Sequence, residues 1–532
     1  MDYIKFLLIT AIFVSNGYSA TLRVCLESPV YEFDIHKAHD TSSVEVLHKK
    51  VYESLVKYYP EKKSYYSLIA DKIEFPAANK ILINLKKNIN FHSNKYFKPK
   101  RTLNADDLIF SFSRQMLKNI KSKKEQSEFV NYRDRQLDER IIEIKRVNDH
   151  TVLMTTKSKF MDVYELFSEH FLAINSKEYY DQLKRNNKLE YFSEFPIGTG
   201  PFKFVNKKKK LQVNLERFDK YHGNKPKYKK LNFYLVSNNE KRTNYSLNGK
   251  CHITHNPSWS AIKSIEKNKT LKILPSLKNN MLFMVFNTQK GPFKNKELRK
   301  IVAKSLNIED YIRDAFYGHG KRANHILTPN FKEYNNDYTP IQKDIIEARK
   351  QIKKLYPYKK LTLNLWTLTV PRPYCPDGVS LAQKIKIDLS KVGIIVNIIK
   401  KPFDEFLKKT SRGEHDFALL GMANITGQEE ILMSLTCNSI KNGSNRARWC
   451  NKKYDKLISL YFSTKNIQAR KAILKEISLI FNSEIPRLQI AYMPKNKVVS
   501  KNILNYNFTN DSAGDYTNIV FLNDVIKSLK SK

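Results

Sequence analysis

The chain has 532 residues, of which 41% are hydrophobic and 12% aromatic, and this length exceeds what a single hydrophobic core supports. Its 94 Lys and Arg residues outnumber its 52 Asp and Glu residues, which gives a formal net charge of +42. Because the excess is mostly lysine spread along the whole chain, and not gathered in one patch, we expect no nucleic-acid partner.

The N-terminus has the pattern of an export signal. An apolar run from residue 6 to 14 is followed by small and polar residues. A run this short cannot cross a bilayer as a helix, whereas a short apolar region before small residues is typical of a secretion signal. We therefore predict a cleavable signal peptide over residues 1–20, cut after Ser19 or Ala20. The residues before Cys25 lack the pattern of a lipid-modified cysteine, so we expect no lipid anchor.

The first third of the chain alternates between predicted strands and helices. The pattern predicts a strand over 21–26, a helix over 44–56 and a strand over 80–85. Asn104 is a credible N-cap for a helix with apolar residues at 105, 108, 109, 112 and 116. Further elements are a hairpin over 141–155, with its turn at Asn148 and Asp149, and a Gly/Pro-rich domain crossing over 194–204.

The best-defined unit runs from residue 361 to 430. It reads as three strands, 361–366, 394–399 and 417–420, that alternate with two amphipathic helices. This order predicts an open parallel α/β sheet, in which ligands bind beyond the carboxyl ends of the strands. Two loops emerge at that edge: the proline-rich "VPRPYCPDG" (370–378) and "GMANITGQEE" (421–430). Arg372 is therefore a candidate for contacting a ligand.

The five cysteines are Cys25, Cys251, Cys375, Cys437 and Cys450. In an exported protein an even subset pairs and one is left over. Cys437 and Cys450 flank a polar loop, which favours a local disulfide. Cys251, His252 and His255 are residue types that bind metals, but no fourth ligand is near in the sequence, so we expect no metal. A disulfide between Cys25 and Cys251 explains Cys251 better than a metal site does, and it leaves Cys375 free.

No motif of a known catalytic site is present in the sequence. There is no Gly-x-Ser-x-Gly elbow, no phosphate-binding loop and no His-Glu-x-x-His. Asp106 and Asp107 lie in the first turn of a predicted helix, where acidic residues favour the helix dipole. A large exported protein with a ligand edge and no catalytic apparatus points to binding and delivery, so we expect neither an enzyme nor a cofactor.

Several segments, in order along the chain, resemble one family: the extracytoplasmic solute-binding proteins of family 5 of ABC transporters (peptide/nickel-binding type). The segments are "VYESLV" (51–56), "INFHSN" (89–94), "RTLNADDLIFSFSR" (101–114), "PIGTGPFKF" (196–204) and "FNTQKGPFKNKELRKIVAKSLN" (286–307). Three more resemble the dipeptide-binding branch of that family: "RPYCPDG" (372–378), "GEHDFALLG" (413–421) and "GSNRARWCN" (443–451).

The resemblance implies a two-lobed α/β periplasmic-binding-protein fold, of class II and cluster C, hinged around a central cleft. It implies a discontinuous lobe I (21–50, 195–277 and 492–532), an inserted subdomain (51–194) and lobe II (278–491). It also implies that Arg372 pairs with the ligand's carboxylate, that Tyr374 lines the same end, and that the disulfides are Cys25–Cys251 and Cys437–Cys450.

One loop departs from the dipeptide-binding branch. Where that branch has Gly-Trp followed by an aspartate for the ligand's ammonium, this chain has Met422, with the aspartate position near Asn424 or Ile425. An ammonium buried without a counter-charge is costly. Three interpretations stay open: Glu429 or Glu430 replaces the aspartate, the pocket is open at that end for longer peptides, or only the ligand's carboxylate is recognised.

From these observations we expect a periplasmic, monomeric receptor that captures di- or oligopeptides and delivers them to a membrane permease. The alternatives within the same fold are a receptor for haem, for an antimicrobial peptide or for a metal chelate. Alternatives of another class are a secreted enzyme and a chaperone-like surface protein.

Overall fold

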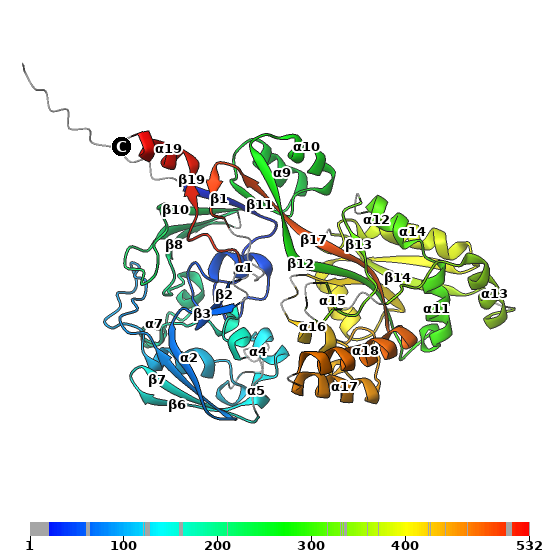
Figure 1. The fold of residues 1–532 in the computed structure, drawn as a ribbon, viewed down its shortest axis with the longest axis horizontal. Coiled ribbons are helices and arrows are strands. Elements are labelled where there is room, and N and C mark those ends of the chain that lie inside the picture. Colours follow the sequence, from blue (N-terminus) through cyan, green and yellow to red (C-terminus); the bar gives the residue numbers. More distant parts are fainter. Residues whose placement is uncertain are drawn as a thin grey trace, which may run out of the picture.

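The computed structural model describes residues 21–530 except 60–63, 121, 123–127, 159–162, 210, 316–317, 330, 332, 335–337, 359, 371, 424, 426, 442, 465 and 507–512. The chain forms two lobes joined by two long strands, as Figure 1 shows. These strands are β12 (Leu271–Phe286) and β17 (Arg487–Ser500), which pair with each other antiparallel. In the part of the chain that is described, they lie in one eleven-stranded sheet of order β15-β14-β16-β12-β17-β11-β1-β10-β9-β8, to which β13 is attached through β17.

Lobe I, on the left in Figure 1, holds the N-terminal half of the chain and the C-terminal segment. Its strands in the large sheet are β1 (Thr21–Leu26), β8 (Phe202–Lys208), β9 (Gln212–Arg217), β10 (Lys230–Leu235) and β11 (Ile253–His255). Its helices there are α1 (Thr41–Leu47), α9 (Asn239–Leu247), α10 (Ile262–Lys267) and α19 (Leu522–Lys530). The short strands β18 (Ile503–Leu504) and β19 (Val520–Phe521) pair beside them.

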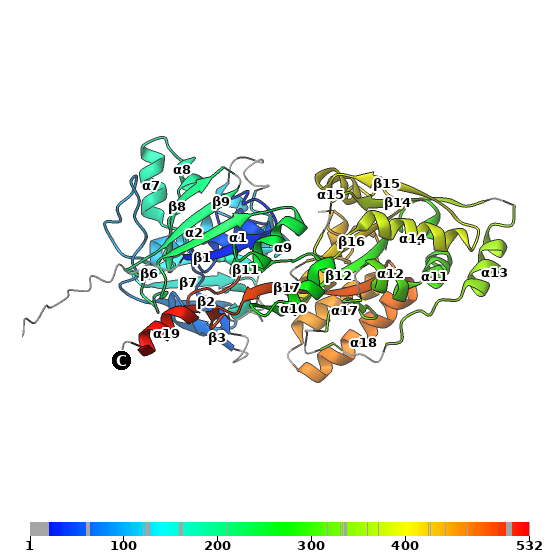
Figure 2. The ribbon, with the colours of Figure 1, turned by 90° about the horizontal axis from the view of Figure 1, so that it is seen from above.

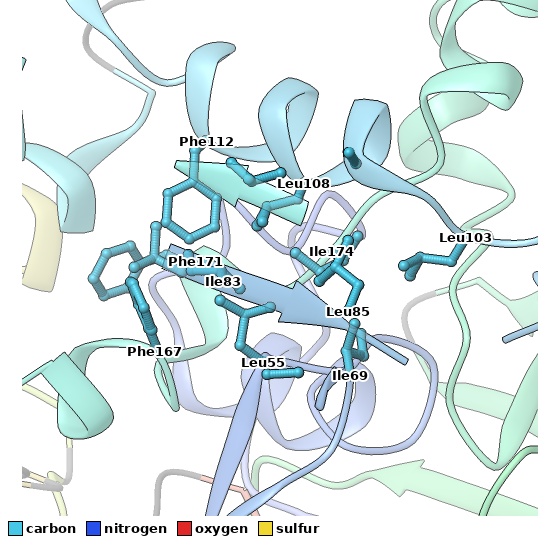
Figure 3. Close-up of a cluster of buried hydrophobic side chains, with 14 of the residues drawn as sticks. Leu55, Ile69, Ile83, Leu85, Leu103, Leu108, Phe112, Phe167, Phe171 and Ile174 are labelled. Atoms are coloured by element: carbon cyan, nitrogen blue, oxygen red, sulfur yellow. The ribbon is translucent and has the colours of Figure 1, made fainter. Parts of the chain in front are cut away.

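A separate core fills the lower part of lobe I. Its sheet has the order β4-β5-β7-β6, with β4 (Ala70–Ala77), β5 (Lys80–Leu85), β6 (Ile141–Asn148) and β7 (Thr151–Thr156), beside the hairpin β2 (Val56–Tyr59) and β3 (Ser64–Ser67). The helices are α2 (Ala105–Ser113), α4 (Val130–Asp134), α5 (Leu137–Arg140), α6 (Val163–Leu166), α7 (Lys177–Arg185) and α8 (Tyr191–Glu194). Figure 3 shows Leu108 and Phe112 of α2 packed toward Ile83 and Leu85 of β5.

Lobe II covers both faces of its part of the sheet with helices (Figure 2). Its strands are β13 (Lys321–Arg322), β14 (Thr362–Leu368), β15 (Ile395–Lys401) and β16 (Phe417–Met422). Its helices are α11 (Lys296–Ser305), α12 (Ile308–Ala315), α13 (Ile345–Leu355), α14 (Gly378–Ser390), α15 (Phe403–Ser411), α16 (Gln428–Met433), α17 (Lys452–Ser463) and α18 (Ile467–Glu484). No helix in the described residues is long and apolar enough to span a bilayer.

Most predicted elements are confirmed. Strand β14 pairs parallel with both β15 and β16, as the pattern over 361–430 predicts. The Asn104 side chain caps α2 by accepting a hydrogen bond from the Asp106 amide, and the 141–155 segment is the predicted hairpin. The sheet as a whole is mixed, because β12 pairs antiparallel with β16.

The helix predicted over 44–56 is wrong. Helix α1 ends at Leu47, and Lys49 takes the left-handed conformation with φ of 66°. The Lys50 and Val51 carbonyls accept hydrogen bonds from the amides of Phe202 and Gly200, so they are not available to a helix. Gly200 allows this approach, since a Cβ there would lie 2.3 Å from the Lys50 carbonyl oxygen. Apolar periodicity alone does not reveal such a long-range partner.

Candidate functional site: an arginine loop beside the lobe crossing

The proline-rich loop after β14 is a tight turn that leads into a capped helix. Arg372 and Cys375 exchange two backbone hydrogen bonds of 2.9 Å, which closes the turn. Two residues later, the Asp377 side chain accepts a 2.9 Å hydrogen bond from the Ser380 amide and caps α14. The turn and the cap together hold residues 372–377, called the arginine loop from here on, in one backbone conformation.

Tyr374 fixes this loop against the strands that join the lobes. Its side chain is buried, and a Cβ on Gly421 would lie 2.3 Å from two of its ring carbons. The same Cβ would lie 2.5 Å from the carbonyl oxygen of Met281 in β12, and the Asn280 side chain donates a 3.3 Å hydrogen bond to the Pro373 carbonyl. Tyr374 therefore needs a glycine at position 421, and the arginine loop lies directly beside β12.

Arg372 is half-buried and has capacity left for a ligand. Its guanidinium carbon lies 4.0 Å from the centre of the Phe403 ring, a stacked cation–π contact. Its Nε is buried and has no hydrogen-bond partner in the described part of the chain. Burial raises the pKa of Tyr374 to about 12, while the neighbouring Arg372 opposes that rise. A planar guanidinium mounted in this way matches the two oxygens of a carboxylate.

The second predicted loop lies next to the first. Met422 is the last residue of β16, pairs in register with Met281 and is half-buried. Ile425 is 1% exposed and packs into the core of lobe II. Asn424 lies outside the described residues. Of these three predicted site residues, the structure therefore leaves Met422 partly accessible and uses Ile425 for packing.

Glu429 reaches across to the other lobe. Its Oε2 lies 3.0 Å from Nη1 of Arg135, which follows α4 in lobe I. Arg135 also donates a 3.1 Å hydrogen bond to Glu169 of its own lobe, and lies 3.7 Å from Glu430. The four carboxylates of Glu165, Glu169, Glu429 and Glu430 raise the pKa of Arg135, against the effect of its burial. We call Arg135 and Glu429 the seam pair.

The sequence analysis missed three residues of this region. They are Phe403, Asn280 and Arg135. Phe403 lies in the second helix predicted between residues 361 and 430, Asn280 has no distinguishing sequence pattern, and Arg135 lies 294 positions from Glu429. An aromatic residue directly after a strand of a parallel sheet lies at the ligand edge, so the position of Phe403 was a usable signal. No local signal marked the other two.

The structure contains both expected cysteine pairs. Cys25 is bonded to Cys251 with a Cα–Cα distance of 5.9 Å, and Cys437 to Cys450 with one of 4.5 Å. Cys375 is a buried free thiol, and burial raises its pKa to about 12. Within the described residues no group of three or more His, Cys, Asp or Glu side chains is placed to hold a metal ion.

Known peptide-binding proteins are similar to this chain in sequence. The chain is 28% identical over 427 residues to a dipeptide-binding protein of Escherichia coli, which covers 80% of each chain. It is 29% identical over 430 residues to di/tripeptide-binding protein 3 of Pseudomonas aeruginosa, which covers 78% of this chain and 79% of the relative.

Solved structures agree with the fold. One is a dipeptide-binding protein from Pseudoalteromonas sp. SM9913 in complex with Met-Leu, with a TM-score of 0.85, 24% identity, and coverage of 94% of this chain and 100% of the other. Another is a periplasmic binding protein from Helicobacter pylori in complex with the peptide STSA, with a TM-score of 0.84, 22% identity, and coverage of 94% and 98%.

The sequence also matches a family model over most of its length. That model describes bacterial extracellular solute-binding proteins, family 5 Middle, and it matches residues 66–444. Because the match spans more than half of the chain, the protein belongs to the bacterial extracellular solute-binding proteins of family 5.

Proposed function

We propose that this protein is the peptide-capturing component of an ABC transporter, which binds a di- or oligopeptide between its lobes and delivers it to a membrane permease. The observation that carries the proposal is Arg372, a half-buried cation held by the arginine loop beside the lobe crossing, whose Nε has no hydrogen-bond partner among the described residues. The names of the peptide-binding relatives support the same ligand class.

In this proposal Arg372 anchors the C-terminal carboxylate of the peptide. Phe403 stacks on the guanidinium and keeps it from turning away, while Tyr374 holds the loop on Gly421. The ligand would then stabilise the closed form through contacts that exist only when the lobes are together, and the permease would recognise that form.

The other end of the ligand is less constrained. In this structure the Glu429 carboxylate already pairs with Arg135, so a peptide ammonium would have to compete with a guanidinium for it. Glu430 also lies 3.7 Å from Arg135, so of the three interpretations of this loop these contacts disfavour the one in which Glu429 or Glu430 replaces the missing aspartate. Longer peptides and ligands recognised by their carboxylate alone then remain the alternatives.

The lobe boundaries are part of the proposal: lobe I at 21–50, 195–277 and 492–532, an inserted subdomain at 51–194, and lobe II at 278–491. The buried clusters support this division. One draws only on residues between 55 and 197. A second joins residues at 22–52 with others at 202–253 and 499–521, and includes Ala173 of the inserted subdomain. Two more lie between 281 and 493. We further propose export by a signal peptide to the periplasm, where relatives named as periplasmic proteins support the location, and action as a monomer.

A thermal-shift screen tests the proposal. Dipeptides, tripeptides and longer peptides, each with a free or an acetylated N-terminus, are expected to raise the melting temperature. Equal shifts for free and acetylated peptides would exclude Glu429 as the ammonium partner. A response to haem or a metal chelate and to no peptide would overturn the ligand class.

The anchor is tested by Arg372→Ala, with Arg412→Ala as a matched control that removes an exposed arginine of the same lobe. Loss of a charge-assisted, bidentate interaction predicts peptide binding that is weaker by about 30-fold or more in calorimetry, against no change in the control. Binding of unchanged strength by Arg372→Ala would contradict the assigned role.

A further inference from the structure

The tip of the hairpin formed by β8 and β9 combines exposed charge with exposed apolar surface. Strand β8 is at one end of the large sheet, and lysine occupies positions 207–210, where the chain turns into β9. The structure describes Lys207, Lys208 and Lys209, called the tip lysines from here on, and all three are exposed. Leu211 in the turn is 65% exposed, and Val205 in β8 is 47% exposed. Lysine is common along the whole chain, so the lysines alone do not mark a binding surface; the two apolar side chains beside them are the further observation.

The acidic residues of this segment lie away from the tip and have partners of their own. Between residues 202 and 235 the sequence contains two, Glu216 and Asp219. Glu216 lies 3.4 Å from Lys203, and Asp219 lies 2.8 Å from Arg217. Glu216 is four positions along β9 from Gln212 at the tip, which is about 13 Å and longer than the Debye length of about 8 Å at physiological ionic strength. These carboxylates therefore do not neutralise the tip lysines.

A neighbouring segment of lobe I holds the hairpin in place. The Phe33 ring is buried and lies 5.5 Å from the Phe204 ring of β8, and Nζ of Lys207 lies 5.0 Å from its centre. Glu32 is the acidic residue next to this ring, and its Oε1 accepts hydrogen bonds of 2.8 and 2.7 Å from the amides of residues 33 and 34. The carboxylate is thus bound to its own backbone, while Phe33 supports the hairpin from the body of the lobe.

Protection of the sheet edge explains these residues only in part. Lysines on an edge strand keep other chains from pairing with it. Lys208 and Gln212 form the last pair of the β8–β9 ladder, so Lys209 and Leu211 lie in the turn beyond it, where there is no strand edge to protect. Lysines beside an exposed leucine are typical of surfaces that lie on a lipid membrane, where the charges meet anionic headgroups and the apolar side chain enters the acyl boundary. A polyanion such as a nucleic acid would contact the lysines and leave Leu211 in water.

We propose that the β8–β9 tip binds the surface of an anionic phospholipid membrane. The tip lysines contact the lipid phosphates, and Leu211 inserts at the boundary between headgroups and acyl chains. Each lysine near such a surface contributes a factor of about five in affinity, so three lysines and one leucine give weak, reversible binding. This inference goes beyond the proposed function, and because membrane binding needs no peptide, it can fail while peptide binding stands.

Sedimentation with lipid vesicles tests this inference. The wild type should bind vesicles of phosphatidylcholine mixed with phosphatidylglycerol, should not bind phosphatidylcholine alone, and should be released by added salt. Replacing the three tip lysines by glutamine should lower the partition coefficient by about 100-fold. The matched control replaces Lys452, Lys453 and Lys456 by glutamine, which removes the same charge from the exposed side of α17 in lobe II. The control should change the partition coefficient by less than about three-fold, since those lysines lie outside the tip.

A second variant, Leu211→Ser, keeps every lysine of the edge strand, so it tests the tip even if the lysine variant aggregates. It should lower the partition coefficient by about five-fold, because a leucine that enters the acyl boundary loses part of its contact with water. Equal losses in the two lysine variants would show that net charge alone drives binding, and wild-type binding by Leu211→Ser would show that the tip does not enter the membrane. Either result would overturn the proposal, as would a wild type that binds no anionic vesicles.

Discussion

The seam pair gives the sharpest prediction about lobe closure. Arg135 and Glu429 belong to different lobes, and their side chains are only 14% and 21% exposed in this structure. When the lobes separate, Glu429 loses this partner and returns to water, while Arg135 keeps Glu169. The variant Glu429→Gln should therefore weaken closure, and with it the binding of any ligand that requires closure.

The size of this effect follows from the geometry. At an N–O distance of 3.0 Å and an effective dielectric constant of about 20, the Coulomb attraction is roughly 5 kcal/mol. Partial desolvation of both ions and the retained Arg135–Glu169 contact offset most of it, so a net coupling of about 1–2 kcal/mol is expected. In affinity this corresponds to a loss of about 5–30-fold.

A double-mutant cycle measures the coupling. Peptide affinity is determined by calorimetry for the wild type, Arg135→Met, Glu429→Gln and the double variant, and small-angle X-ray scattering reports lobe separation. Glu128→Gln is the control, since its ion pair with Lys37 lies within lobe I and should not affect affinity. Additive effects, or an unchanged affinity in Glu429→Gln, would refute the assignment of the seam pair to closure.

Three further predictions concern stability. Burial lowers the pKa of His92 to about 4, so below about pH 6.5 the unfolded chain binds a proton that the folded chain does not. Between about pH 6.5 and 4 this group should lower the free energy of unfolding by up to ~1.4 kcal/mol per pH unit as the pH falls. In urea denaturation at several pH values, His92→Gln should show a smaller dependence of the free energy of unfolding on pH than the wild type. Gly421→Ala places a methyl group against the Tyr374 ring, so it should lower the free energy of unfolding in urea by about 1–3 kcal/mol and weaken peptide binding. A variant with the stability and peptide affinity of the wild type would contradict the packing of Tyr374 on Gly421. Replacing Cys437 and Cys450 by serine should lower the free energy of unfolding by about 3 kcal/mol. If the variant were as stable as the wild type, the disulfide would not constrain the unfolded chain.

The sequence predicted elements well where two local signals coincide. Helix α2 has both an amphipathic stripe and the Asn104 cap, and the unit from β14 to β16 has alternating strands and helical stripes in the right order. The arginine loop was predictable for the same reason, since the ends of parallel strands share one edge of the sheet.

Features that depend on distant partners were not predictable. Apolar spacing over 44–56 suggested a helix, but the carbonyls of Lys50 and Val51 bond to the chain near residue 200. The seam pair joins residues 294 positions apart, and the buried position of Ile425 depends on how helices fold over it. In each case the deciding contact is invisible to a local window of sequence.

The position of β17 in the sheet bears on how the protein is made. This strand lies in the middle of the large sheet, between β12 and β11, yet it is among the last segments to be synthesised. Until it emerges, β11 and β12 present unpaired backbone edges, and neither lobe has its complete sheet. A growing chain therefore cannot fold to the native state before β17 is made, which would keep it unfolded for export across a membrane. A chain truncated before β17 should aggregate instead of folding, because these strand edges stay unpaired.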